Sequence, residues 1–223
     1  MTNLNPPYSY AIAWKLFGDL RKLYRLGVEE LARSATTPLI GINGYHEYGL
    51  SSYPLAVAVW EAFLNENCMS GKTESTFPDS MLWDIRDKAE WWRIEEKTLL
   101  IPKLLLGKTF DKSAPPYQDF SHLVKIRNHI VHFRSEVVPV KAVRQLYERH
   151  ITFGQQVVGN PWHLQLESTE CVRWAINVVS NMIGFLISLF PNGYLSELAM
   201  VFKGISEDEA RSIFLAASVV PNT

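Results

Sequence analysis

Cysteine is scarce in this chain of 223 residues, which contains only Cys68 and Cys171. The two cysteines lie far apart in the sequence, and no grouping of histidine, cysteine, aspartate or glutamate has the spacing of common metal ligands. The sequence therefore predicts neither a disulfide framework nor a metal site. It indicates a reduced protein of the cytoplasm.

Other functional signatures are also absent. Gly41–Gly44 is the nearest approach to a phosphate-binding loop, but it lacks the lysine and the strand-to-helix setting. No Gly-x-Ser-x-Gly elbow occurs. Residues 1–7 lack the basic and apolar regions of a signal peptide, and polar residues interrupt the most apolar segment, residues 172–190. We expect a cytoplasmic protein with no cofactor and no membrane partner, in which residues 172–190 form a central core helix.

Helical periodicity extends along most of the chain, and no segment predicts a strand. The predicted helices cover residues 9–32, 53–65, 80–106 with a break or kink at Pro102, 117–134, 140–151, 168–190 and 206–217. The helix over residues 53–65 is apolar nearly all round and should therefore be central. Short connections between amphipathic helices predict one all-α domain, an antiparallel bundle. The tryptophans expected in the core are Trp83, Trp91, Trp92 and Trp162.

Charge is nearly balanced overall but unevenly distributed. The whole chain has a net charge of −1. Residues 97–149 contain ten lysines or arginines and four acidic residues, a net charge of +6, so the remainder carries −7. Such a stretch favours local attraction of a polyanion, although solvated helix faces would give the same composition.

The segment Phe120–Arg134 carries the strongest functional signal. It contains Arg127, Asn128 directly after it, and His132 four residues further on. A guanidinium holds a phosphate with paired donors, and an imidazole moves a proton near neutral pH. These residue types therefore predict phosphodiester chemistry, with Arg127, Asn128 and His132 as the catalytic candidates.

The segment resembles the Arg-polar-x(3)-His motif of the HEPN superfamily, all-helical domains that include many metal-independent ribonucleases. Residues 52–66, with Glu61 and, one turn on, Asn65, are similar to the HEPN helix that carries a glutamate and an asparagine. Residues 91–108 resemble the linking section of some bacterial branches. The resemblance covers about residues 50–190, and the helices over residues 9–32 and 206–217 are additions to that core.

The resemblance implies a HEPN-type bundle and an endoribonuclease that requires no metal. His132 would act as general base or acid, while Arg127 and Asn128 would stabilise charge on the scissile phosphate. The products would carry a 2′,3′-cyclic phosphate and a 5′-hydroxyl. A homodimer pairing two motif helices, a toxin–antitoxin or anti-phage setting, and an antitoxin or regulatory partner are also implied. The supporting residues are Glu61, Asn65 and His129, and the candidate RNA contacts are Lys125 and Arg134.

Helix geometry leaves the role of Arg127 open. At about 100° per residue, Arg127 falls in the middle of the apolar face, and about 140° separates it from His132. A buried arginine needs an acidic partner, and Glu61 is the acidic residue of the central helix before Asn65, so we expect Arg127 and Glu61 to lie close together. Arg127 is then either catalytic or a structural partner of Glu61. In the second case, Asn128 and His132 form the working face.

Two alternatives to an enzyme remain. The same helices would serve as a non-catalytic HEPN module that binds RNA, a nucleotide or a partner protein, with the motif as an anion clamp. A dimeric interaction protein, in which the motif only holds helices together, is the other alternative. A cleft that joins both copies of His132 favours the enzyme, whereas burial of the motifs away from solvent favours the interaction protein.

Overall fold

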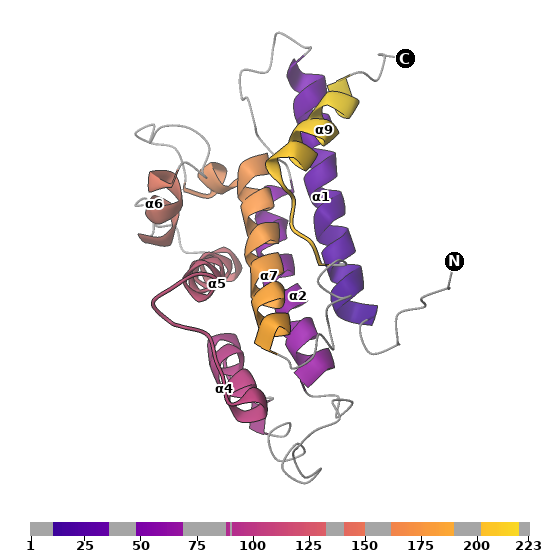
Figure 1. The fold of residues 1–223 in the computed structure, drawn as a ribbon. Helices are drawn as coiled ribbons and strands as arrows, with labels where there is room; N and C mark the ends of the chain where they lie inside the picture. Colours follow the sequence, from indigo (N-terminus) through magenta and orange to yellow (C-terminus); the bar gives the residue numbers. More distant parts are fainter. Residues whose placement is uncertain are drawn as a thin grey trace, which may run out of the picture.

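The structure is a computed structural model that describes residues 11–35, 48–68, 88–89, 91–132, 141–149, 162–189 and 202–218. Every regular element in these ranges is a helix (Figure 1). The α-helices are α1 (Ala11–Ala35), α2 (Gly49–Cys68), α4 (Ile94–Leu106), α5 (Tyr117–Val131), α6 (Lys141–Glu148), α7 (Thr169–Leu189) and α9 (Glu207–Ser218), and η2 (Trp162–Leu166) is a 3-10 helix. The predicted all-α class is confirmed.

Helices α1, α2 and α7 lie side by side and form the centre of the protein (Figure 1). The first turn of α1 contacts the last turn of α2, where the Ile12 N–H donates to Glu66 Oε1 at 3.0 Å, so these two helices are antiparallel. In contrast, the first turns of α2 and α7 are neighbours, because Tyr53 Oη donates to the carbonyl of Leu166 at 3.0 Å. Helices α2 and α7 are therefore parallel, which a simple antiparallel bundle does not predict.

Helix α2 is central, as its apolar character predicts. Its Trp60 is fully buried and contacts Phe63, Phe110 and Phe120, with ring centroids 5.9–6.2 Å apart. The indole Nε1 of Trp60 donates to Thr98 Oγ1 at 2.8 Å. A single α2 side chain thus connects α4, α5 and the segment between them, and this packing determines where α5 lies.

The predicted helix over residues 80–106 is shorter in the described part of the chain. The backbone of Arg93 is extended, and its N–H donates to the Glu96 carboxylate at 2.9 Å, so α4 begins at Ile94. Pro102 lies inside α4 without ending it, because proline removes only the bond to the Thr98 carbonyl. The helix ends at Leu106, and Gly107 follows as its C-terminal cap with a φ of 69°. Of the predicted break or kink at Pro102, the break does not occur, because α4 continues through this residue.

Helix α7 is buried in the core, as expected. By length and apolar composition it would suffice to cross a membrane, the one such helix among the residues that the structure describes. Half of that apolar window is buried inside the protein, with Met182 and Ile183 fully enclosed. The arrangement is compatible with a soluble protein.

The tryptophans are placed less uniformly than predicted. Trp162 is buried and Trp92 packs against the core, but Trp91 is 86% exposed. Trp91 lies in the turn that precedes α4. Trp83 lies outside the described residues.

Candidate functional site

The candidate site is built on α5, which lies across the side of the α2 and α7 pair (Figure 1). The helix buries one face against these two neighbours, through Tyr117, Phe120, Leu123, Val124 and Ile126. The predicted apolar face is confirmed at Phe120, Leu123 and Val124. Towards the end of the helix it opens: Ile130 is half-buried, and Val131 is 55% exposed.

Arg127 belongs to the inward-facing side of α5, where periodicity places it. The residue is half-buried, and its Nε is buried without a hydrogen-bond partner in the described part of the structure. A buried guanidinium nitrogen that donates to nothing costs free energy, on the order of 1–3 kcal/mol or more for a charged group. Arg127 therefore retains donor capacity that this fold leaves unused.

Glu61 is not the partner of Arg127. Its Oε1 accepts a hydrogen bond from Lys97 Nζ at 2.8 Å, and between the described residues 61 and 127 no ion pair forms. The packing gives the reason. Trp60, next to Glu61, contacts Phe120, whereas Arg127 lies two turns further along α5, a rise of about 10 Å. Lys97 on α4 is closer, so Glu61 balances the charge of that buried lysine.

His132 and Asn128 lie on the open side of α5, and both are exposed. Helix α5 ends at Val131, and His132 follows as its C-terminal cap with φ −107° and ψ 51°. The N–H of His132 donates to the Asn128 carbonyl at 3.0 Å, so the two residues are one turn apart. Asn128 and His132 therefore share a solvent-facing position, while Arg127 is directed towards the core.

The other predicted site residues are distributed around these. His129 is half-buried, and its ring lies edge-on to Trp162, with centroids 6.4 Å apart, which attaches the end of α5 to η2. Lys125 is exposed on α5, and Asn65 is exposed on α2. Arg134 lies outside the described residues.

Two functional candidates, Lys97 and His122, were not predicted from the sequence. Lys97 is 7% exposed and holds Glu61, and its only sequence signal is a lysine between buried apolar positions of α4. His122 on α5 has a buried Nδ1 without a hydrogen-bond partner among the described residues. A signal for His122 did exist, because Asp119, His122 and Lys125 recur every three residues on one side of the helix.

The electrostatic surroundings of His122 come from two helices. Burial lowers its pKa, and the positive charges of Lys125, Arg149 and Lys141 lower it further, while Asp119 opposes them. Arg149 Nη1 donates to Asp119 Oδ1 at 2.5 Å, which joins the end of α6 to the first turn of α5. The pKa of His122 therefore lies below the usual histidine value because of burial and a locally cationic environment.

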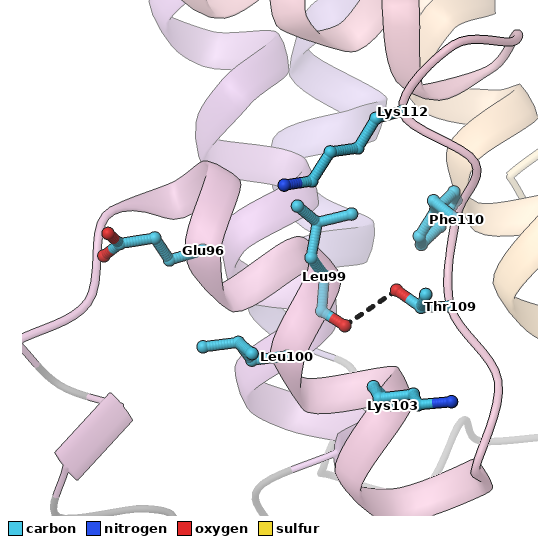
Figure 2. Close-up of a pocket in the computed structure, with 7 residues that line it drawn as sticks. All are labelled: Glu96, Leu99, Leu100, Lys103, Thr109, Phe110 and Lys112. Carbon is cyan, nitrogen blue, oxygen red and sulfur yellow. Dashed lines mark hydrogen bonds between the residues drawn. The ribbon is translucent and has the colours of Figure 1, made fainter.

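No metal centre accompanies these residues in the described ranges, where no three histidine, cysteine or acidic side chains form a cluster. Two hollows lie elsewhere. One, of about 350 Å³, is lined by Glu96, Leu99, Leu100, Lys103, Thr109, Phe110 and Lys112 (Figure 2). The second, of about 370 Å³, is lined by Tyr24, Val28, Leu31, Thr169, Glu170, Ala210, Arg211 and Leu215. Neither is lined by a residue of the Arg127–His132 motif.

The hollow in Figure 2 is built by the end of α4 and the segment that follows. Thr109 Oγ1 donates to the Leu99 carbonyl at 2.7 Å and holds that segment against the helix. Its floor is apolar, and its charged residues do not converge on one point in Figure 2. It offers no catalytic grouping.

Comparison with protein-family models, with curated proteins and with solved structures finds no match to this chain.

Proposed function

We propose that this protein is a metal-independent endoribonuclease of HEPN type, with His132, Asn128 and Arg127 as its catalytic residues. The observation that carries the proposal is the end of α5. There, an exposed imidazole and an exposed amide stand one turn apart, beside an arginine with an unused donor. Acid–base chemistry requires an accessible imidazole, and charge stabilisation requires free donors.

The proposed reaction transfers a phosphoryl group within RNA from a 5′-oxygen to the neighbouring 2′-oxygen. Neutral His132 accepts the proton of a ribose 2′-hydroxyl, and the 2′-oxygen forms a bond to phosphorus as the bond to the 5′-oxygen breaks. A protonated imidazole donates a proton to that leaving 5′-oxygen. The products are a 2′,3′-cyclic phosphate and a 5′-hydroxyl, and no oxidant or metal takes part. Asn128 and Arg127 donate to the phosphate oxygens as negative charge grows on them.

A homodimer completes this scheme, because one chain supplies a single His132 to the reaction. Two copies paired across a two-fold axis would provide one imidazole as base and the other as acid. The exposed Val131 beside His132 supports such pairing, since a large apolar side chain at the end of α5 gains free energy when it is covered. The direction of Arg127 then sets a requirement: its guanidinium must turn outward at the helix end to reach the phosphate.

A non-catalytic anion-binding module is the second candidate, and a specific observation favours it. Arg127 and His132 differ by about 140° around α5 and leave the helix on different sides. In this alternative, Arg127 supports the helix packing, and Asn128 and His132 bind a phosphate without cleaving it. A toxin–antitoxin or anti-phage setting is part of the first proposal only.

The deciding experiment is cleavage of a labelled mixed-sequence RNA with EDTA present. The purified wild type is compared with His132→Ala, Asn128→Ala and Arg127→Lys, each checked by circular dichroism and for its oligomeric state. Lys108→Ala, at an exposed position after α4, is the control for a lost surface charge. We expect cleavage with cyclic phosphate ends in the wild type and control, and a loss of about 100-fold or more in His132→Ala.

Cleavage that is unchanged in folded His132→Ala would refute the catalytic assignment. RNA binding without cleavage by a folded wild-type dimer would support the binding module instead. Arg127→Lys keeps the charge but loses the paired donors, so a normal rate in that variant would limit Arg127 to a structural role.

A further inference from the structure

The side of α5 next to α6 forms a second cationic region, separate from the His132 end of the helix. We call His122, Lys125, Lys141 and Arg149 the α5–α6 surface. Lys125, Lys141 and Arg149 supply three positive charges, and Asp119 is the acid that acts on His122 beside them, so these residues have a net charge of +2. Asp119 is already engaged by Arg149 at 2.5 Å. The surface therefore has more positive charge than its own acids balance.

His122 lies between the charges of both helices. Asp119 and Lys125 act on it from α5, and Lys141 and Arg149 act on it from α6. Its Nδ1 is buried and accepts or donates no hydrogen bond within the described structure. A buried polar nitrogen among like charges is unfavourable for the free protein, which is a common property of sites completed by a ligand.

An anion would relieve the repulsion among these like charges. A phosphate among Lys125, Lys141 and Arg149 would balance their charge, and it would also favour the protonated imidazole of His122. Lys125 and Lys141 are exposed, so a ligand reaches them without any rearrangement of the fold. Because Lys141 and Arg149 lie at opposite ends of α6, an extended polyanion fits the surface better than one small ion.

We propose that the α5–α6 surface binds the phosphodiester backbone of a single-stranded nucleic acid, and that His122 takes up a proton when it does so. The proposal deepens the ribonuclease hypothesis, on which it rests for the choice of RNA as the natural ligand. His122, Lys125 and His129 lie within about 60° of one another around α5, and His132 follows at the helix end. A strand that follows this side from His122 reaches His132 after about 15 Å.

Binding should therefore strengthen as the pH falls. The free imidazole has a pKa below its usual value, and a bound phosphate raises that pKa, so the complex holds more protons than the free protein. Affinity rises when the pH is lowered through the pKa of the complex and levels off below the pKa of the free protein. The gain is about tenfold for each unit by which the ligand raises the pKa.

The test uses a fluorescent 2′-deoxy oligonucleotide of about 12 nucleotides, which has no 2′-hydroxyl and so resists the proposed cleavage. Anisotropy titrations of the full chain are made at about pH 7.5 and about pH 5.5, with constant salt. We expect the wild type to bind about three- to tenfold more tightly at the lower pH, and His122→Gln to lose most of that gain. His163→Gln, on η2 and outside the α5–α6 surface, is the control and should keep most of it.

Lys141→Gln gives an independent measurement, because an exposed lysine is replaced without disturbing the core. It should weaken binding at both pH values and lower the salt dependence of log K by about 0.7 for a lost phosphate contact. Lys108→Gln makes the same change of charge away from this surface. Equal weakening by the two lysine variants, or an unchanged pH dependence in folded His122→Gln, would overturn the proposal.

RNA cleavage by the same variants separates this inference from the proposed function. If the wild type binds DNA through the surface but cleaves no RNA, the ribonuclease hypothesis fails and the polyanion site stands. If RNA is cleaved normally while His122→Gln and Lys141→Gln leave KM and DNA affinity unchanged, the surface is not a binding site. A rise in KM with unchanged kcat in Lys141→Gln is the expected result.

Discussion

The pair formed by Lys97 and Glu61 permits a quantitative test of how α2, α4 and α5 are arranged. Lys97 is 7% exposed, and its ammonium donates to a Glu61 carboxylate whose side chain is 40% exposed. Removing one partner of a fully buried pair costs about 3–5 kcal/mol, whereas an exposed pair is worth about 0–1 kcal/mol. Water reaches this carboxylate, so we expect Glu61→Gln to lower the free energy of unfolding by about 1–2 kcal/mol.

Double-mutant cycles show whether the loss of free energy of unfolding in Glu61→Gln comes from the interaction with Lys97 or with Arg127. Urea denaturation followed by circular dichroism is measured for Glu61→Gln, Lys97→Met, Arg127→Met and the two double variants that contain Glu61→Gln. The cycle with Lys97 should give a coupling free energy of about 1 kcal/mol, and the cycle with Arg127 should give a value within about 0.5 kcal/mol of zero. A larger coupling with Arg127 than with Lys97 would refute the packing described here and restore the pair expected from the sequence.

Three further predictions concern local features. Gly107→Ala should destabilise the protein by about 1 kcal/mol in urea denaturation, entirely through the backbone, because φ is 69° and an added Cβ meets nothing within 4 Å. Ser206→Ala should cost about 1 kcal/mol in the same assay, since Ser206 Oγ accepts from the Glu209 N–H at 3.1 Å at the start of α9, and Ser206→Asp should restore most of it. The pKa of His122 is lower in the folded protein than in the unfolded chain, so the unfolded chain binds more protons as the pH falls. The free energy of unfolding should therefore decrease as the pH drops through the usual histidine range. Urea denaturation between about pH 7.5 and pH 5.5 should show a smaller decrease in His122→Gln.

The elements that sequence predicted best are those whose signals are local. Periodicity predicts α1, α5, α7 and α9 with ends within a few residues. The start of α4 at Ile94 was not predicted. It depends on one hydrogen bond from the Arg93 N–H to Glu96, whereas the surrounding apolar and charged residues follow a continuous helical pattern. Pro102 was expected to break or kink the helix, but the helix does not break there, because the loss of one hydrogen bond is tolerated.

The position of Arg127 could be predicted from the sequence, but its surroundings could not. Its position on α5 follows from 3.6 residues per turn and was predicted, including its conflict with the direction of His132. Its partner depends on where α5 meets α2, which the contact between Phe120 and Trp60 sets, and a one-dimensional pattern contains no such information. The hydrogen bond from Trp60 Nε1 to Thr98 Oγ1 joins α2 to α4 and brings Lys97 within reach of Glu61, while the Arg127 Nε has no hydrogen-bond partner among the described residues. The surroundings of Arg127 therefore depend on how α2, α4 and α5 pack together, and only the residue types at the end of α5 could be predicted from the sequence.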